Sequence, residues 1–267
     1  MQYKIFLVLI VAMLVSFFSI PIKAQTPVSE VSVAMKKAGN SAIQIATHLK
    51  NVLRLPPETV AELLKGAGFL APEIGKVLKR VFHLGVDKTS TTLKRLFSFT
   101  DRVTVSVLKK IGYSINTVAH WLKTTGASAE QSALYLKSGF SPSNWILAKT
   151  LRVGGWGINA VAKALKFVSI LPNEIASLIK QVFSARDEAI AYALKFAGET
   201  MNEIAAALKF IGVTLNKSSE LLREIFGVSN KVANEALRAA GWIINQPIYK
   251  APPVYKKKTL AAPRKIQ

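Results

Sequence analysis

The chain contains no cysteine among its 267 residues and only three histidines. Without cysteine there is no disulfide, no lipid-modified cysteine behind a leader and no thiolate metal site. The histidines, His48, His83 and His120, have no partner at the spacing of a ligand pair, so we expect no metal site and no cofactor. A protein of this composition must rely on packing alone for its stability.

Acidic residues are also scarce. The sequence has 15 Asp and Glu against 36 Lys and Arg, a formal net charge of +21. Such an excess predicts an anionic partner, which would be nucleic acid, an acidic polysaccharide, lipopolysaccharide or an anionic membrane surface. Charge does not choose among them. Half of the residues are hydrophobic, so a continuous core is available and a disordered chain is excluded.

Long apolar runs are absent except near the start, between Ile5 and Ile20. Lys4 precedes this run, Pro21 breaks it and Ala24 offers a cleavage site, a pattern typical of a secretory signal peptide. The alternative is an uncleaved anchor, for which the run is short of the roughly 20 residues that span a bilayer. We therefore expect a signal peptide over 1–24, a repeat domain over 25–242, a basic tail over 243–267, and a secreted or cell-envelope protein.

An apolar residue followed at once by Lys or Arg recurs fifteen times, always 14 or 15 residues after the previous pair. Internal repetition of this kind predicts that one small unit is stacked many times. The pairs are Met35-Lys36, Leu49-Lys50, Leu64-Lys65, Leu78-Lys79, Leu93-Lys94, Leu108-Lys109, Leu122-Lys123, Leu136-Lys137, Leu151-Arg152, Leu165-Lys166, Ile179-Lys180, Leu194-Lys195, Leu208-Lys209, Leu222-Arg223 and Leu237-Arg238.

Each repeat has the pattern of one short helix and a tight turn. An aliphatic residue and an alanine commonly stand four and three places before the leucine, as in Val161-Ala162, and share one helix face with it. Glycine often follows the basic residue by three places and suits the left-handed residue that ends a helix. Prolines such as Pro57 and Pro172 fall where the next helix should begin. The predicted fold is all-α, an α-solenoid of about 14 short antiparallel helices.

The repeat length correlates with the type of turn. Steps with a glycine shortly after the basic residue are mostly 14 residues long and steps without it mostly 15; the exceptions follow Lys137 and Lys166. One unbroken helix would also return every pair to one side, but recurring glycine and proline argue against it. Between Lys79 and Lys109 there is neither a proline nor a well-placed glycine, so one longer helix is an open alternative there.

The segments from Leu108 to Lys123 and from Leu194 to Lys209 resemble the repeat of large bacterial exported proteins, in which glycine-tyrosine-serine and valine-phenylalanine turns alternate between leucine-lysine pairs. The resemblance covers roughly residues 30 to 242 and implies an exported repeat protein. It carries no known activity. In this chain the two turn types alternate irregularly.

The repeated basic residues and the lysines of the tail are the candidate anion-binding residues. In an antiparallel stack they would form two ladders with rungs near 10 Å apart, able to track a polyanion without reading its sequence. The alternative is that they only offset the helix dipole at each C-terminus. The candidates are Lys36, Lys50, Lys65, Lys79, Lys94, Lys109, Lys123, Lys137, Arg152, Lys166, Lys180, Lys195, Lys209, Arg223, Arg238, Lys256, Lys257 and Lys258.

No catalytic constellation recurs along the chain, so we expect no enzyme and no small-molecule substrate. The predicted function is a secreted, non-enzymatic protein of the envelope or extracellular matrix that binds anionic polymers through its basic ladders. Two alternatives are open: a filament subunit that associates through the solenoid ends, and a membrane-active basic helical protein. We expect the tryptophans and Tyr113 and Tyr135 mostly to pack between helices.

Overall fold

The computed structural model describes residues 28–244, and in this part of the chain every regular element is a helix. Fifteen helices pack against their neighbours as an α-solenoid, which confirms the predicted fold class. None of these helices is long and apolar enough to cross a bilayer. The expected signal peptide and most of the expected tail, including Lys256, Lys257 and Lys258, lie outside the described residues.

The described chain divides into two compact units, and the division falls within α8 (Ile115–Thr124) and α9 (Ala129–Phe140). The N-terminal unit comprises residues 28–121 and 138–141, and the C-terminal unit comprises residues 122–137 and 142–244. The first holds α2 (Val28–Lys37), α3 (Ala42–Asn51), α4 (Pro57–Gly66), α5 (Ala71–Arg80), α6 (Val86–Phe97) and α7 (Asp101–Ile111). The second holds α10 (Asn144–Val153), α11 (Ile158–Phe167), α12 (Pro172–Phe183), α13 (Asp187–Phe196), α14 (Met201–Phe210), α15 (Leu215–Phe226) and α16 (Asn230–Ala239).

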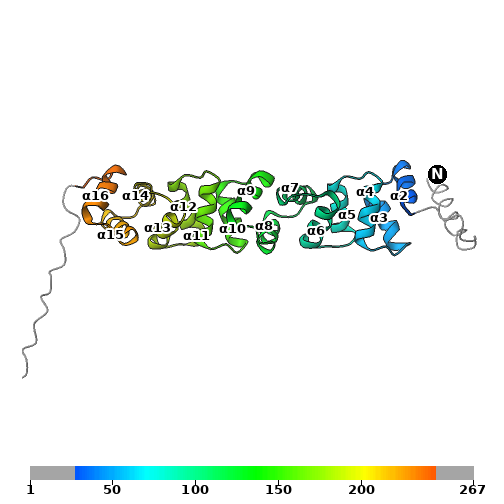
Figure 1. Cartoon of the computed structure of the whole chain (residues 1–267), viewed down its shortest axis with the longest axis horizontal. Coiled ribbons are helices and arrows are strands. Elements are labelled where there is room, and N and C mark those ends of the chain that lie inside the picture. Colours follow the sequence, from blue (N-terminus) through cyan, green and yellow to red (C-terminus); the bar gives the residue numbers. More distant parts are fainter. Residues whose placement is uncertain (1–27, 245–267) are drawn as a thin grey trace, which may run out of the picture. The chain divides into compact units, whose positions relative to one another are not determined.

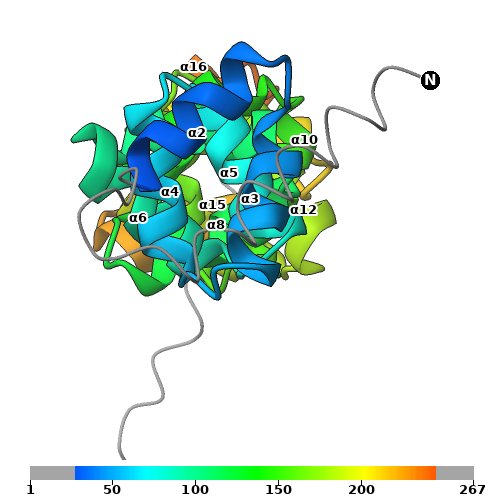
Figure 2. The ribbon, with the colours of Figure 1, turned by 90° about the vertical axis from the view of Figure 1, so that its right-hand side faces the viewer.

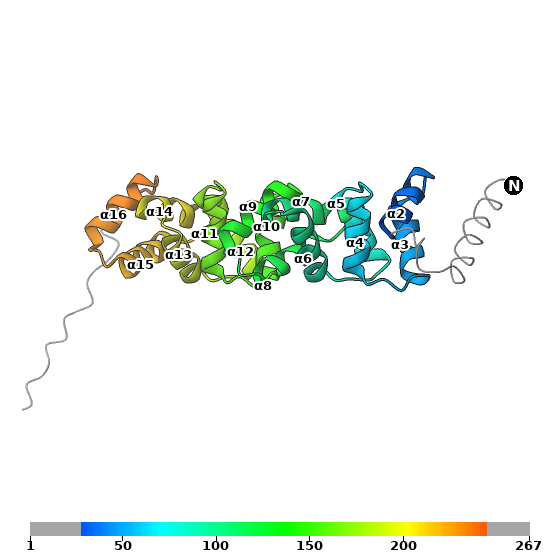
Figure 3. The ribbon, with the colours of Figure 1, turned by 45° about the vertical axis from the view of Figure 1, so that its right-hand side comes forward.

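Within each unit the helices succeed one another in chain order, and each packs on the next helix and on the next but one (Figures 1 and 3). In the N-terminal unit, α2 and α4 lie on one side and α3 and α5 on the other (Figure 2). Even-numbered helices therefore end at one edge and odd-numbered helices at the opposite edge. We call these the even edge and the odd edge of a unit.

The core is built from the apolar member of each pair and the residues one turn before it. All thirteen leucines of the pairs are fully buried, and so are alanines such as Ala61, Ala162 and Ala205 three places earlier. Burying a leucine side chain stabilises the fold by about 1.5–3 kcal/mol, and the small alanine lets the adjacent helix approach closely. Helices of ten to twelve residues, marginal alone, are stabilised by this packing.

The position of a left-handed residue in each turn sets the length of the repeat. It stands three places after the basic residue in every 14-residue step and four places after it in every 15-residue step. Ser169, three places after Lys166, is the left-handed residue of a 14-residue step that has no glycine there. Ser141, four places after Lys137, is the left-handed residue of a 15-residue step, whereas Gly139 is not left-handed. Both exceptions in the sequence pattern are thereby explained. Ser98 is a left-handed cap between α6 and α7, so the longer helix considered for Lys79 to Lys109 does not form.

Candidate functional site: the basic ladders and the residues beside them

All fifteen repeated basic residues lie in the last turn of their helices. This confirms that each pair marks a helix end. The question for function is whether their side chains point away from the protein or are held by it.

Eleven of the fifteen donate a hydrogen bond to a backbone carbonyl near the end of the helix two places further along the chain. Lys137 Nζ, for example, donates to the carbonyl of Val168 at 2.8 Å, and Lys50 Nζ to that of Val81 at 2.7 Å. The donors are Lys36, Lys50, Lys65, Lys79, Lys109, Lys137, Arg152, Lys166, Lys180, Lys195 and Lys209, and their acceptors are Ala67 and Gly68, Val81, Leu96, Gly112, Phe140, Val168, Val182, Gly198, Ile211, Ile225 and Gly241.

These bonds follow from the chemistry of a helix end. The last four carbonyls of a helix have no partner within it and carry the negative end of its dipole. A cation from the parallel helix next but one satisfies such a carbonyl through a charge-assisted hydrogen bond, which is worth about 1.5–3 kcal/mol where it is shielded from water and less at an exposed edge. The repeated residue is therefore a cross-brace between repeats as well as a charge.

Nine of the fifteen repeated cations lie over an aromatic ring, and all of these except Lys123 also donate to a helix-end carbonyl. Lys36 Nζ is 4.5 Å from the ring centroid of Phe69, and Lys79 Nζ is 4.5 Å from that of Tyr113. Cation–π contacts at such partly exposed sites contribute about 0.5–1 kcal/mol each. The remaining contacts pair Lys50 with Phe82, Lys65 with Phe97, Lys109 with Phe140, Lys123 with Trp156, Arg152 with Phe183, Lys195 with Phe226 and Lys209 with Trp242.

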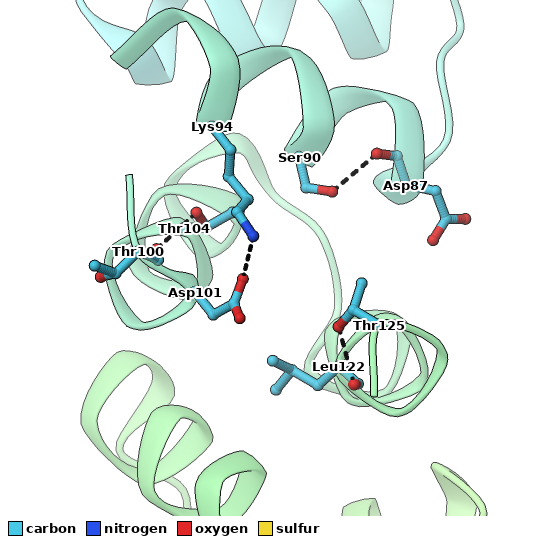
Figure 4. Close-up of polar contacts among 8 residues, drawn as sticks. All are labelled: Asp87, Ser90, Lys94, Thr100, Asp101, Thr104, Leu122 and Thr125. Atoms are coloured by element: carbon cyan, nitrogen blue, oxygen red, sulfur yellow. Dashed lines mark hydrogen bonds and ion pairs between the residues drawn. The ribbon is translucent and has the colours of Figure 1, made fainter. Parts of the chain in front are cut away.

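Lys94 and Arg223 depart from the carbonyl pattern by turning to the start of the following helix. Lys94 Nζ lies 2.7 Å from Asp101 Oδ1 at the first residue of α7 (Figure 4). Arg223 Nη1 donates to Asn230 Oδ1 at 2.7 Å. Arg238, in the last described helix, has no acceptor among residues 28–244. Its helix has no described successor two places on.

Lys166 has a carboxylate where its counterparts have an aromatic ring. Glu199 follows the turn glycine Gly198, as Tyr113 and Trp242 follow theirs, and one of its carboxylate oxygens lies 3.1 Å from Lys166 Nζ. Glu199 is buried, and its Oε1 has no hydrogen-bond partner among the described residues. Burial raises the pKa of Glu199, and the hydrogen bond from Lys166 offsets only part of that rise.

The position directly after each repeated basic residue differs between the two units. In the N-terminal unit it is often a second cation, namely Lys37, Arg80, Arg95 or Lys110, and all four are exposed. Arg95 pairs with Glu62 at 2.7 Å, whereas the other three have no hydrogen bond or ion pair within the described residues. We call these four residues the second row.

In the C-terminal unit the same position carries no cation. Four of its helices have an exposed apolar side chain there: Val153, Phe167, Phe196 and Phe210. The two units thus share a framework but present different chemistry at the helix ends.

The other side chains with candidate chemistry in the described region are the metal-ligating and the aromatic residues. Residues 28–244 contain no group of three His, Asp or Glu residues placed to hold a metal ion. Among the candidate aromatics, Trp121 and Trp156 are buried as expected, but Trp145 is exposed beside Lys149. No protein-family model matches the sequence, and no curated protein is detectably similar to it.

Sequence reasoning located the ladder residues but missed both their acceptors and the second row. The signal for the acceptors is the spacing of 31 to 34 residues between a basic residue and an aromatic two repeats on, as from Lys36 to Phe69 or Lys79 to Tyr113. The signal for the second row is the doublets Lys36-Lys37, Lys79-Arg80, Lys94-Arg95 and Lys109-Lys110, which occur only in the N-terminal unit among the described pairs.

Proposed function

We propose that this protein is an exported, non-enzymatic repeat protein that binds anionic polymers of the cell envelope or extracellular matrix through the basic edges of its solenoid. The observation that carries the proposal is the presence of regularly spaced, exposed cations in addition to those that brace the repeats. Arg80 and Lys110 on the odd edge of the N-terminal unit are the central pair.

This odd edge has the geometry of a polymer track. Arg80 and Lys110 end α5 and α7, which pack directly on each other, so the two charges are spaced by about one interhelix distance of 8–10 Å. Arg54 extends the row from the turn after α3, whose Lys50 reaches the carbonyl of Val81 beside Arg80. Evenly spaced charges suit a flexible anionic chain, and arginine can hold a phosphate, sulfate or carboxylate through two parallel hydrogen bonds.

The local balance of charge on this edge is strongly positive. Arg54, Arg80 and Lys110 share the edge with Lys50, Lys79 and Lys109, which are bonded to carbonyls, and Lys88 adds another cation at the start of α6. The acids at the helix starts of this edge are Glu30, Glu58 and Asp87. The braced lysines therefore contribute to the attractive field, while Arg80 and Lys110 supply donors that have no partner among the described residues.

The test is a set of salt-dependent binding assays with nucleic acid, lipopolysaccharide and a sulfated or carboxylated glycan in parallel. The protein is the expected exported form from Gln25, and the variants are Arg80→Gln with Lys110→Gln against a control with Arg186→Gln and Lys231→Gln in the C-terminal unit. We expect the first pair to weaken binding to the preferred polymer about tenfold at physiological salt and the control to change it less than threefold. Equal effects of the two pairs would count against a site on this edge.

A filament built through the solenoid ends is the second candidate function, and the last helix disfavours it. Most inner helices have a fully buried alanine three places before the leucine or isoleucine of the pair, such as Ala205, whereas α16 has Asn234 there and Glu235 beside it. A polar outer face on the terminal repeat is typical of a cap that keeps a solenoid from stacking further. Light scattering over a range of concentrations tests this, and a constant monomer mass is expected.

A further inference from the structure

The odd edge of the C-terminal unit carries a row of exposed apolar side chains that the polymer-binding proposal does not use. Phe167 and Phe196 end α11 and α13 and are each 58% exposed, and Leu171, at the start of α12, is 73% exposed. Trp145 and Ile146, in the first turn of α10, are exposed as well. We call these five residues the apolar row.

Contacts between backbone and side chains place the apolar row on one edge. Lys166 donates to the carbonyl of Gly198, which brings the end of α11, with Phe167, beside the end of α13, with Phe196. Leu171 follows Phe167 after a turn of three residues. Asn144 Nδ2 donates to Glu174 Oε1 at 2.8 Å, so α10 begins beside the beginning of α12, and Trp145 lies next to this contact.

Cations are interspersed with these side chains. Lys149 Nζ lies 4.7 Å from the ring centroid of Trp145, and Lys137, Lys166 and Lys195 donate to helix-end carbonyls along the same edge. The acids of this edge are engaged: Glu199 pairs with Lys166, Glu174 accepts from Asn144, and Glu203 accepts from the backbone and hydroxyl of Thr200. Glu224, near the end of α15, accepts a hydrogen bond from the hydroxyl of Tyr192. Lys137, Lys149 and Lys195 are left without an acidic partner among the described residues.

We propose that the apolar row docks on the surface of an anionic lipid bilayer. Single large side chains that protrude between lysines suit a fluid interface, where the apolar groups enter the acyl boundary and the amines stay at the headgroups. A second copy of the chain fits poorly, because an isologous contact through this edge would bring the same unpaired lysines together. The inference is independent of the polymer site, which lies in the other unit.

The experiment measures binding of the chain from Gln25 to vesicles of equal parts phosphatidylglycerol and phosphatidylcholine by co-sedimentation. The variant carries Phe167→Gln, Leu171→Gln and Phe196→Gln. The matched control carries Val153→Gln and Phe210→Gln, which are 55% and 63% exposed but lie at helix ends of the even edge. All substituted side chains are exposed, and thermal unfolding verifies that each variant folds.

Wild type should bind the vesicles, the apolar-row variant should bind at least about tenfold more weakly, and the control should bind as wild type does. Trp145 should show a blue-shifted emission on binding, because its indole leaves water. Failure of the wild type to bind, or equal binding by the apolar-row variant, would overturn the inference. The outcomes for the two sites separate: Arg80→Gln with Lys110→Gln should reduce polymer binding and leave the dependence on the apolar row unchanged.

Discussion

Lys137 and Val168 are 31 residues apart in the sequence, and the ammonium of the first donates to the carbonyl of the second at 2.8 Å. The same relationship joins ten further basic residues to helix ends two places along, so it is a repeated element of the framework. A residue type that first suggests ligand binding thus has a structural role at most positions. A binding function assigned to the ladders therefore needs evidence beyond the presence of these cations at the helix ends.

Removing a lysine that braces two repeats should reduce the stability of the protein more than removing an exposed lysine that has no partner. We expect Lys137→Met to lower the free energy of unfolding by about 1 kcal/mol, because the carbonyl of Val168 loses its donor and the helix end its cation. Lys110→Met, at an exposed position without a described partner, should change it by less than about 0.5 kcal/mol. Urea denaturation followed by circular dichroism measures both, and equal losses would contradict a bracing role.

Glu199 should destabilise the protein at neutral pH. Its pKa is raised by burial, so the folded state takes up a proton more readily than the unfolded state, and the favourable contribution present at low pH is lost as pH rises through the folded pKa. We expect Glu199→Gln to raise the melting temperature at pH 7, and the gain to shrink as pH falls through the raised pKa of Glu199 toward the ordinary range of a glutamate. Glu199→Tyr, which restores the ring found after Gly112, should raise it too.

A melting temperature that Glu199→Gln leaves unchanged at pH 7, or lowers, would show that the pair with Lys166 outweighs the burial of the carboxylate. Glu203→Gln is the comparison for a less buried acid four residues on. The pKa of Glu203 is lowered mainly by the Thr200 backbone hydrogen bond, so its removal should reduce stability at pH 7 and matter less in acid.

Two glycines in neighbouring helices should respond oppositely to alanine. A Cβ on Gly75 would lie 2.7 Å from Ile111 Cγ1 in the core, so Gly75→Ala should cost about 1–3 kcal/mol through overpacking. Gly66 has open space and helical backbone, and Gly66→Ala should gain about 0.5–1 kcal/mol through the lower entropy of the unfolded chain. Chemical denaturation gives the free energy of unfolding of both variants. A lower value for Gly66→Ala than for wild type would contradict the open space at this position.

The left-handed residues in the turns give a prediction about the stability of the protein. Ser184 has a φ of 52°, so Ser184→Gly should stabilise the protein by about 0.5–1 kcal/mol, whereas Gly198→Ala, with a φ of 83°, should cost about 1 kcal/mol or more. Ser177→Gly, within α12, is the control and should destabilise. A loss of stability in Ser184→Gly would contradict the role given to this position.

Much of the fold follows from the sequence because each repeat consists largely of residues with strong conformational preferences. The buried leucines, the alanines three places earlier and the turn glycines predict fifteen helix ends, and all are found. Ser169 and Ser141 could not be assigned in advance, because serine has little preference for a left-handed conformation and is placed there by the packing of its neighbours. The same limit explains why two repeat lengths did not fit the glycine pattern.

The candidate site could be predicted only in part, for a geometric reason. The sequence places Lys79 at a helix end, but its acceptor, the carbonyl of Gly112, is brought near only by the stacking of α5 on α7. Whether a lysine is braced or free therefore depends on contacts between helices. Arg80, one residue later on the same helix, is exposed and has no partner among the described residues, and its only signal in the sequence is the doublet Lys79-Arg80.

The most direct test of the central claim is the salt dependence of binding to the preferred anionic polymer, followed by fluorescence anisotropy. The logarithm of the affinity should fall linearly with the logarithm of salt concentration. Arg80→Gln with Lys110→Gln should make the slope shallower by about 1–2, whereas Lys137→Met should leave it nearly unchanged while lowering stability. An affinity insensitive to salt, or slopes that are the same for wild type and the Arg80 and Lys110 variant, would contradict the account.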